Sequence, residues 1–155
     1  MRQALTMGSP IGPLDFTENF IGKYSTDEVR EWEQVIIGIA KRLHDDGFDA
    51  FELNFAANNV GQSFLSRARN DRTDEYGAQS LENRTRFAVE VIKGVKEACG
   101  KDFIVQVLIN GIEANDVSLG ADSLYTSIEE TKAIAQILEQ AGADSLHVRL
   151  GPCGQ

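Results

Sequence analysis

The sequence contains few cysteines and no long apolar run, and each scarcity excludes a class of protein. Cys99 and Cys153 are the only cysteines among 155 residues, and they form no CxxC pair. A disulfide scaffold or a cysteine-bound metal cluster within the chain is therefore not expected. No apolar run approaches the ~20 residues that cross a bilayer. The first residues also lack the apolar stretch of a signal peptide, so we expect a soluble, cytoplasmic protein.

Basic residues are scarce relative to acidic ones. The chain has 15 Lys and Arg against 24 Asp and Glu, which gives a net charge of −9. Binding to nucleic acid or to an anionic membrane needs a clustered positive patch, so neither partner is expected. The apolar fraction of 42% is typical of a globular protein. The length is that of one domain with a sizeable core.

Helix-start signals and glycines divide the chain into alternating helices and strands. Residues 25–28 and 127–130 have the S-x-x-E form of a capping box, and apolar residues at helical spacing follow each of them. The clearest strand, 103–109, is mostly β-branched and apolar, as in a parallel strand that is covered on both sides. The predicted elements are a loop over 1–24, a helix over 25–47, a strand over 49–55, a polar loop over 56–79, a helix over 80–100, the strand over 103–109, a helix over 127–142 and a strand from 145 onward.

The same junction between a helix and a strand occurs three times. Gly47-Phe48-Asp49, Gly100-Lys101-Asp102 and Gly142-Ala143-Asp144 each end a predicted helix and begin a predicted strand. Such repeated βα units predict a parallel sheet. Periodicity alone favours a small open α/β sheet and a part of a barrel equally. Three strands cannot close a (β/α)₈ barrel, which takes about 250 residues, so we expect the chain to be truncated at both ends.

The most specific stretch of the sequence lies between residues 70 and 87. It reads Asn70-Asp71-Arg72-Thr73-Asp74-Glu75-Tyr76-Gly77, and then Ser80-Leu81-Glu82-Asn83-Arg84-Thr85-Arg86-Phe87. This stretch resembles the N-x-R-x-D-x-Y-G-G-S-x-x-N-R-x-R-F signature of the Old Yellow Enzyme family, which includes bacterial enoate and dienoyl-CoA reductases. One extra residue, in Ala78-Gln79, interrupts it. We expect its arginines and acids to pair with each other and to order a loop, and not to be catalytic.

The resemblance covers about residues 25–150 and implies a fold. It implies an α/β protein of the (β/α)₈ TIM-barrel class, of which only about three βα units are present. Residues 25–155 would form the central part of this flavin-binding barrel, after an N-terminal segment over 1–24. Residues 47–52 resemble the approach to the fourth barrel strand of the family.

The resemblance also implies an activity. Family members bind FMN at the carboxyl ends of the strands, accept electrons from NAD(P)H, and reduce the activated C=C bond of a small enone or enoate. Two donors after the fourth strand hold the substrate carbonyl oxygen, a tyrosine gives a proton, and an arginine on the fifth strand supports the reduced flavin. Larger relatives add FAD and a [4Fe–4S] cluster after the barrel, in a region outside this sequence. The oligomeric state is left open.

This sequence departs from the family pattern at those positions. Asn54 replaces the first donor and is the candidate for catalysis and for cofactor and substrate binding, because its amide offers a hydrogen bond. Asn59 replaces the tyrosine and is the second catalytic candidate, although an amide is not a useful acid. Ala57 replaces the second donor in the substrate site, and Leu108 stands at the cofactor position of the arginine.

Two further residues lie on the last predicted strand. Arg149 is a substrate-binding candidate because it lies near the carboxyl end of a strand, where barrel active sites are built. The parity of His147 in the strand allows it to point into the barrel. Two functions therefore stay open. One is an FMN-dependent oxidoreductase, as a fragment or divergent member, and the other is an inactive, flavin-free barrel fragment with a structural or interaction role.

Overall fold

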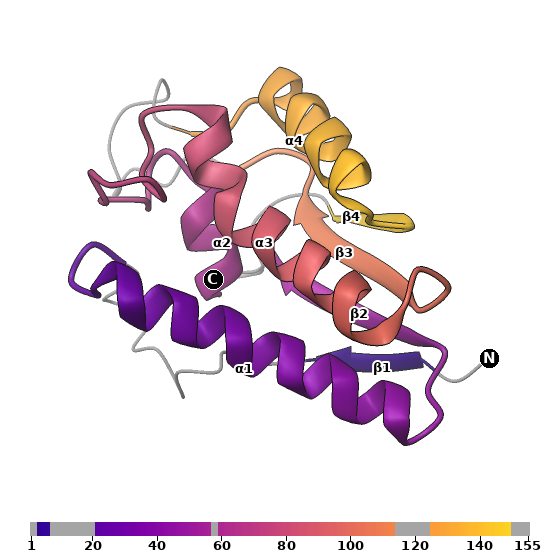
Figure 1. Cartoon of the computed structure of the whole chain (residues 1–155). Coiled ribbons are helices and arrows are strands. Elements are labelled where there is room, and N and C mark those ends of the chain that lie inside the picture. The colour runs from indigo at the N-terminus through magenta and orange to yellow at the C-terminus, as the bar shows by residue number, and fades with distance from the viewer. Residues whose placement is uncertain (1–2, 7–20, 57–58, 114–124, 150–155) are drawn as a thin grey trace.

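The computed structural model describes residues 3–6, 21–56, 59–113 and 125–149, in which strands and helices alternate (Figure 1). None of the helices in these ranges is long and apolar enough to cross a membrane. The elements are, in chain order, β1 (Gln3–Thr6), α1 (Thr26–Asp45), β2 (Ala50–Phe55), α2 (Val60–Leu65), α3 (Leu81–Cys99), β3 (Ile104–Asn110), α4 (Ile128–Ala141) and β4 (Ser145–Arg149).

The strands form one parallel sheet in the order β1-β2-β3-β4. Each strand therefore lies beside the one that precedes it in the chain. In the register, Asn54 of β2 lies opposite Leu108 of β3, and Leu108 lies opposite His147 of β4. This sequential parallel order is the order of strands in a (β/α)₈ barrel.

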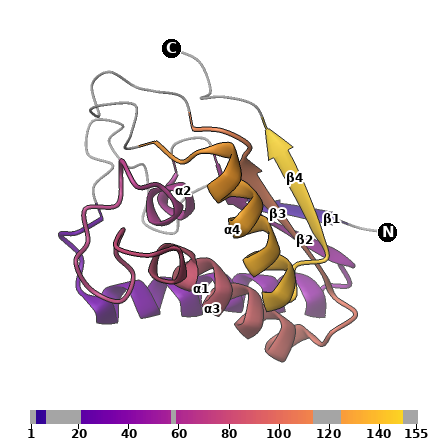
Figure 2. The same ribbon diagram turned by 90° about the horizontal axis from the view of Figure 1, so that it is seen from above.

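Helices α1, α3 and α4 cover one face of the sheet. Helix α3 packs between α1 and α4, and both views show the three helices on the same side of the strands (Figures 1 and 2). An open, doubly wound sheet carries helices on both faces. The one-sided cover therefore favours the barrel over the open sheet, a choice that periodicity left undecided.

The core lies between the sheet and these helices. Phe51 and Leu53 of β2 and Val105 and Val107 of β3 are almost fully buried there. Each such side chain contributes roughly 1.5–3 kcal/mol through the hydrophobic effect. Cys99 is also buried and packs against this core, as a packing residue would, and Cys153 lies outside the described residues.

The three predicted helix-to-strand junctions are confirmed. Gly47, Gly100 and Gly142 have φ values of 84°, 88° and 112°, a region that glycine enters without a Cβ clash. Asp144, at the third junction, accepts hydrogen bonds from the Val105 amide at 2.7 Å and from Lys96 Nζ at 2.6 Å. The two predicted capping boxes are also present, at the starts of α1 and α4.

Two predicted loops contain regular structure. Residues 3–6 pair with β2 as the parallel strand β1, so the described sheet has four strands where three were predicted. Residues 60–65, inside the predicted polar loop, form α2, and all six of its residues are buried. In both places tertiary pairing or packing decides the structure, because neither segment is long enough to show a hydrophobic period.

Candidate active site

The face of the sheet opposite the helices, here called the inner face, is largely polar. Successive side chains of a strand point to opposite faces, and those of Phe51, Leu53 and Phe55 lie in the core beneath the helices. The described inner-face positions of β2 to β4 are therefore Ala50, Glu52, Asn54, Ile104, Gln106, Leu108, Asn110, Ser145, His147 and Arg149. Bulky branched residues dominate the interior of most barrels, so this polar set departs from the usual composition.

A contact across the inner face shows which residues of β2 and β4 lie in the same layer of side chains. Nδ1 of His147 lies 3.3 Å from Oε2 of Glu52, a carboxylate that is only 4% exposed. The inward direction predicted for His147 is thereby confirmed. Alternate strands of a barrel contribute side chains to the same layer. Because β2 and β4 are parallel, the next layer toward their carboxyl ends contains Asn54 and Arg149.

Asn54 is held in a fixed orientation at the end of β2. Its Oδ1 accepts a hydrogen bond from the Ala56 amide at 3.1 Å, and its backbone carbonyl accepts one from Nδ2 of Asn59. The amide oxygen is thus occupied by the main chain. Nδ2 of Asn54 has no hydrogen-bond partner among the described residues. The site therefore offers one oriented N–H donor at the position predicted for substrate contact.

Asn59 is part of the local fold that holds Asn54. Its Oδ1 caps α2 by accepting from the Gln62 amide at 3.1 Å, and its Nδ2 makes the bond to Asn54. Helix α2 lies close to β2, since a Cβ on Gly61 would meet the Phe55 ring at 1.9 Å. Both polar groups of the Asn59 side chain are therefore engaged within the protein.

The other predicted residues are placed by the register. Leu108 is partly buried and lies between Asn54 and His147 on the neighbouring strands. Arg149 lies opposite Asn110, and its carbonyl accepts from the Gly111 amide at 2.8 Å. Ala57 lies outside the described residues. The structure thus brings Asn54, Leu108 and Arg149 to adjacent strand ends, which the sequence predicted only residue by residue.

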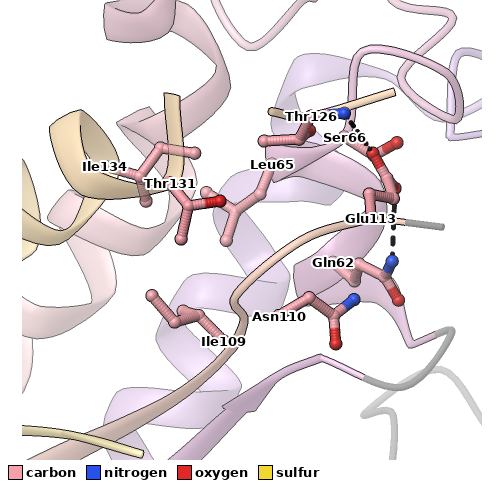
Figure 3. Close-up of a pocket in the computed structure, with 9 residues that line it drawn as sticks. All are labelled: Gln62, Leu65, Ser66, Ile109, Asn110, Glu113, Thr126, Thr131 and Ile134. Atoms are coloured by element: carbon pink, nitrogen blue, oxygen red, sulfur yellow. Dashed lines mark hydrogen bonds between the residues drawn. The ribbon is translucent and has the colours of Figure 1, made fainter. Parts of the chain in front are cut away.

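A small cavity lies behind this site, between α2, the end of β3 and the start of α4 (Figure 3). Its volume is about 20 Å³, which is room for one water molecule. Glu113 bridges it by accepting from Gln62 Nε2 at 3.2 Å and from the Thr126 amide at 2.9 Å. Oγ1 of Thr126 and Oδ1 of Asn110 are buried without a partner among the described residues. Sequence reasoning missed Asn110, although a polar residue that ends a buried strand is a usable signal.

Arg72 and Asp74 of the signature stretch pair with each other, as predicted. Arg72, whose side chain is 3% exposed, binds Asp74 and donates to the carbonyls of Ile21 at 2.8 Å and Tyr24 at 2.7 Å. Asn70 Nδ2 donates to the carbonyls of Phe64 in α2 and of Tyr76 in the loop. These bonds fix the loop to the segment that precedes α1, on the helix side of the sheet.

The second half of the signature joins α3 to α4. Arg84, which is almost completely buried, donates to Oε1 of Glu130 at 2.9 Å, and Arg67 approaches the same oxygen at 3.2 Å. Burial lowers the pKa of Arg84, and the charge of Glu130 opposes that shift. The partner of Arg84 therefore lies in α4, outside the signature stretch, and not within it as predicted.

An acidic cluster lies between α1 and α3. The hydroxyl of Tyr76, a residue only 1% exposed, donates to Oε2 of Glu90 at 2.7 Å. Glu33 of α1 is 5% exposed, and its Oε1 has no partner among the described residues. Burial, together with the neighbouring Glu90 carboxylate, raises the pKa of Glu33 to about 8. This cluster is on the helix side and is separate from the inner face.

Comparison with known proteins supports the family resemblance. The model of the NADH:flavin oxidoreductase / NADH oxidase family matches residues 4–149. The chain is 34% identical over 146 residues to the NADH oxidase of Thermoanaerobacter brockii, which covers 92% of this chain and 21% of that protein. It is 39% identical over 84 residues to the cinnamate reductase of Clostridium sporogenes, covering 54% of this chain and 12% of that protein.

Solved structures agree with these relatives. A 2-naphthoyl-CoA reductase complex superposes with a TM-score of 0.72 at 28% identity, over 83% of this chain and 18% of the other. Morphinone reductase in complex with tetrahydroNAD gives a TM-score of 0.66 at 30% identity, over 81% and 33%. The chain thus spans about a fifth of the NADH oxidase and a third of morphinone reductase. It belongs to the NADH:flavin oxidoreductase / NADH oxidase family, with its Old Yellow Enzyme members, and forms part of their (β/α)₈ barrel.

Proposed function

We propose that this chain supplies the middle of the barrel of an FMN-dependent oxidoreductase that reduces activated C=C bonds with NAD(P)H. Family membership supports the cofactor and the reaction class. The observation that carries the proposal for this chain is the oriented amide of Asn54. Its Nδ2 is available at the carboxyl end of β2, while its oxygen is bound to the Ala56 amide.

The inner face fits a flavin in its chemistry. A flavin ring presents hydrogen-bond acceptors at its pyrimidine edge, and a carbonyl ligand presents an acceptor as well. Nδ2 of Asn54 is a donor that suits either group. When bound, FMN supplies the hydride chemistry. The contribution of the chain is to bind and orient the cofactor and the substrate, and to offset the charge that develops on the substrate.

In this proposal Asn54 binds the carbonyl oxygen of the substrate. That oxygen gains negative charge during reduction, and a fixed N–H donor stabilises the charge without reorganisation. Asn59 has no titratable proton, and both of its polar groups bind the protein. We therefore assign Asn59 to positioning Asn54, and the proton for the α-carbon to a group other than Asn59. Leu108 lies beside Asn54 on the neighbouring strand and offers an apolar surface there.

The proposal is tested with the full-length protein that carries this chain. Purified protein is expected to show the visible absorption bands of bound FMN. Asn54→Ala should retain FMN and weaken the binding of a carbonyl ligand about threefold to tenfold, the loss of one neutral hydrogen bond. Asn54→Asp keeps the shape but removes the donor, so it should weaken binding further. Unchanged affinity in both variants would remove Asn54 from the site.

A second function is supported by the departures from the family pattern. Ala57, Asn59 and Leu108 each lack the acid, donor or cation that the resemblance implies at their positions. A flavin-free barrel with a structural or interaction role needs none of them. A colourless protein that does not bind added FMN would establish this alternative over the enzyme.

FAD and a [4Fe–4S] cluster remain a proposal for a longer protein. The proposal rests on the larger family members, which the resemblance implies carry both groups. The described residues of this chain contain no group of three or more metal-binding side chains. Iron and acid-labile sulfide analysis of the full-length protein, with separation of FMN from FAD, tests both groups directly.

A further inference from the structure

Cationic side chains are distributed unevenly between the two sides of the sheet. Arg72, Arg84 and Lys96 have their ion pairs on the helix side or at the junctions. Arg149 is the only Lys or Arg on the described inner face of β2 to β4, and it lies at the carboxyl end of β4. The chain as a whole carries a net charge of −9, which repels anions. The positive charge of Arg149 is therefore opposite in sign to the net charge of the chain.

The position of Arg149 relative to Asn54 follows from two independent observations. The contact between His147 and Glu52 places these two residues in one layer across β2 and β4. Asn54 and Arg149 each lie two residues further along the same strands, so they share the next layer. Strands β2 and β4 are two strand spacings apart, or about 10 Å. A long arginine side chain and an asparagine amide can converge across that gap, over Leu108 of β3. The Gly111 amide holds the carbonyl of Arg149, so the strand end is fixed.

We propose that Arg149 is a specificity-determining residue, whose guanidinium binds the carboxylate of an α,β-unsaturated acid beside the Asn54 amide. This inference rests on the proposed function and names the kind of ligand that its site selects. The planar guanidinium matches a carboxylate with two parallel hydrogen bonds. The carbon chain of the acid then lies against the apolar side chain of Leu108.

The charge requirement of the reaction explains why a cation matters for such a substrate. Hydride adds to the β-carbon, and the electron pair of the C=C bond moves onto the α-carbon and its carboxylate. NAD(P)H supplies the hydride through the flavin, and a proton then forms the new C–H bond at the α-carbon. The carboxylate already carries one negative charge, so the transition state approaches two. A guanidinium offsets this charge more strongly than a neutral amide does, whereas an uncharged enal needs no such partner.

The experiment compares a charged ligand with its uncharged analogue. Binding of cinnamate and of cinnamaldehyde to the full-length protein is measured by calorimetry for the wild type, Arg149→Met and Arg149→Lys. Methionine removes the charge and retains much of the side-chain length. The Kd for cinnamate should rise about 10- to 100-fold in Arg149→Met, as expected for a hydrogen-bonded charged group. The Kd for cinnamaldehyde should stay within about twofold, and Arg149→Lys should recover part of the cinnamate affinity.

Controls separate this role from folding and from the proposed function. Arg86→Met removes a cation from the helix side and should change neither Kd. Unchanged cinnamate binding in Arg149→Met, or an equal loss for both ligands, would overturn the proposal. Loss of FMN retention with unchanged cinnamate affinity would do the same, because Arg149 would then bind the cofactor. A wild-type protein that holds no FMN but still discriminates the two ligands through Arg149 would sink the proposed reaction and leave the carboxylate site standing.

Discussion

The helix side and the inner face of this sheet follow the family pattern to different degrees. On the helix side, the signature stretch is nearly complete, and Arg72 and Arg84 have ion-pair partners. On the inner face and the loop after it, Asn54, Asn59 and Leu108 stand where other chemistry is implied. In this chain, therefore, the residues that stabilise the fold are separate from those assigned to the proposed reaction. The same barrel frame can therefore support a changed site, and the predictions below test that separation.

The largest expected effect lies on the helix side, at Arg72. Arg72→Ala removes a buried guanidinium from Asp74 and from the carbonyls of Ile21 and Tyr24. Removing one partner of a buried pair costs about 3–5 kcal/mol. We therefore expect the free energy of unfolding of the full-length protein to fall by that amount in urea denaturation. FMN retention by the folded fraction should not change.

Arg86→Ala is the matched control for Arg72. Arg86 forms partly exposed pairs with Glu82 and Glu90, and such pairs contribute about 0–1 kcal/mol. If Arg86→Ala lowered the free energy of unfolding as much as Arg72→Ala, burial would not be what makes the Arg72 pair strong. A direct loss of FMN by folded Arg72→Ala protein would break the separation between fold and reaction.

A pH-dependent effect is expected at Glu33, where the helix side has a carboxyl group that is buried beside a second carboxylate, that of Glu90. Its pKa is raised from 4.5 to about 8 by burial and by Glu90. The folded protein therefore holds this proton at pH values at which the unfolded chain has released it. The resulting stability is present below about pH 4.5 and is lost as the pH rises to about 8, by up to about 1.4 kcal/mol per pH unit.

Urea denaturation between pH 5 and 8.5 checks this dependence. Glu33→Gln mimics the protonated form, so its advantage over the wild type should grow as the pH rises through the window. Glu31→Gln, at an exposed position of the same helix, is the control and should leave the pH profile unchanged. Parallel profiles for the wild type and Glu33→Gln would show that Glu33 ionises normally in the folded protein.

What the sequence predicted and missed follows the same division. The capping boxes and the Gly-x-Asp junctions were predicted correctly because these are local signals in which a few adjacent residues determine the backbone. Strand β1 and helix α2 were missed, since four- and six-residue elements obtain their stability from β2 and from the core. At the site, sequence reasoning selected Asn54 by position. The orientation of its amide depends on Ala56 and Asn59, which no spacing rule specifies.

The smallest expected effect concerns Asn59, where fold and site meet. Its Oδ1 caps α2 and its Nδ2 binds the carbonyl of Asn54. Asn59→Ala should lose about 1 kcal/mol of stability together with affinity for a carbonyl ligand. Asn59→Ser retains a capping oxygen but lacks the amide donor, so it should keep the stability and lose only affinity, because Asn54 is then less well oriented. If both variants instead bound the ligand normally and lost only the rate of reduction, Asn59 would act in the chemical step, and positioning would be the wrong account of it.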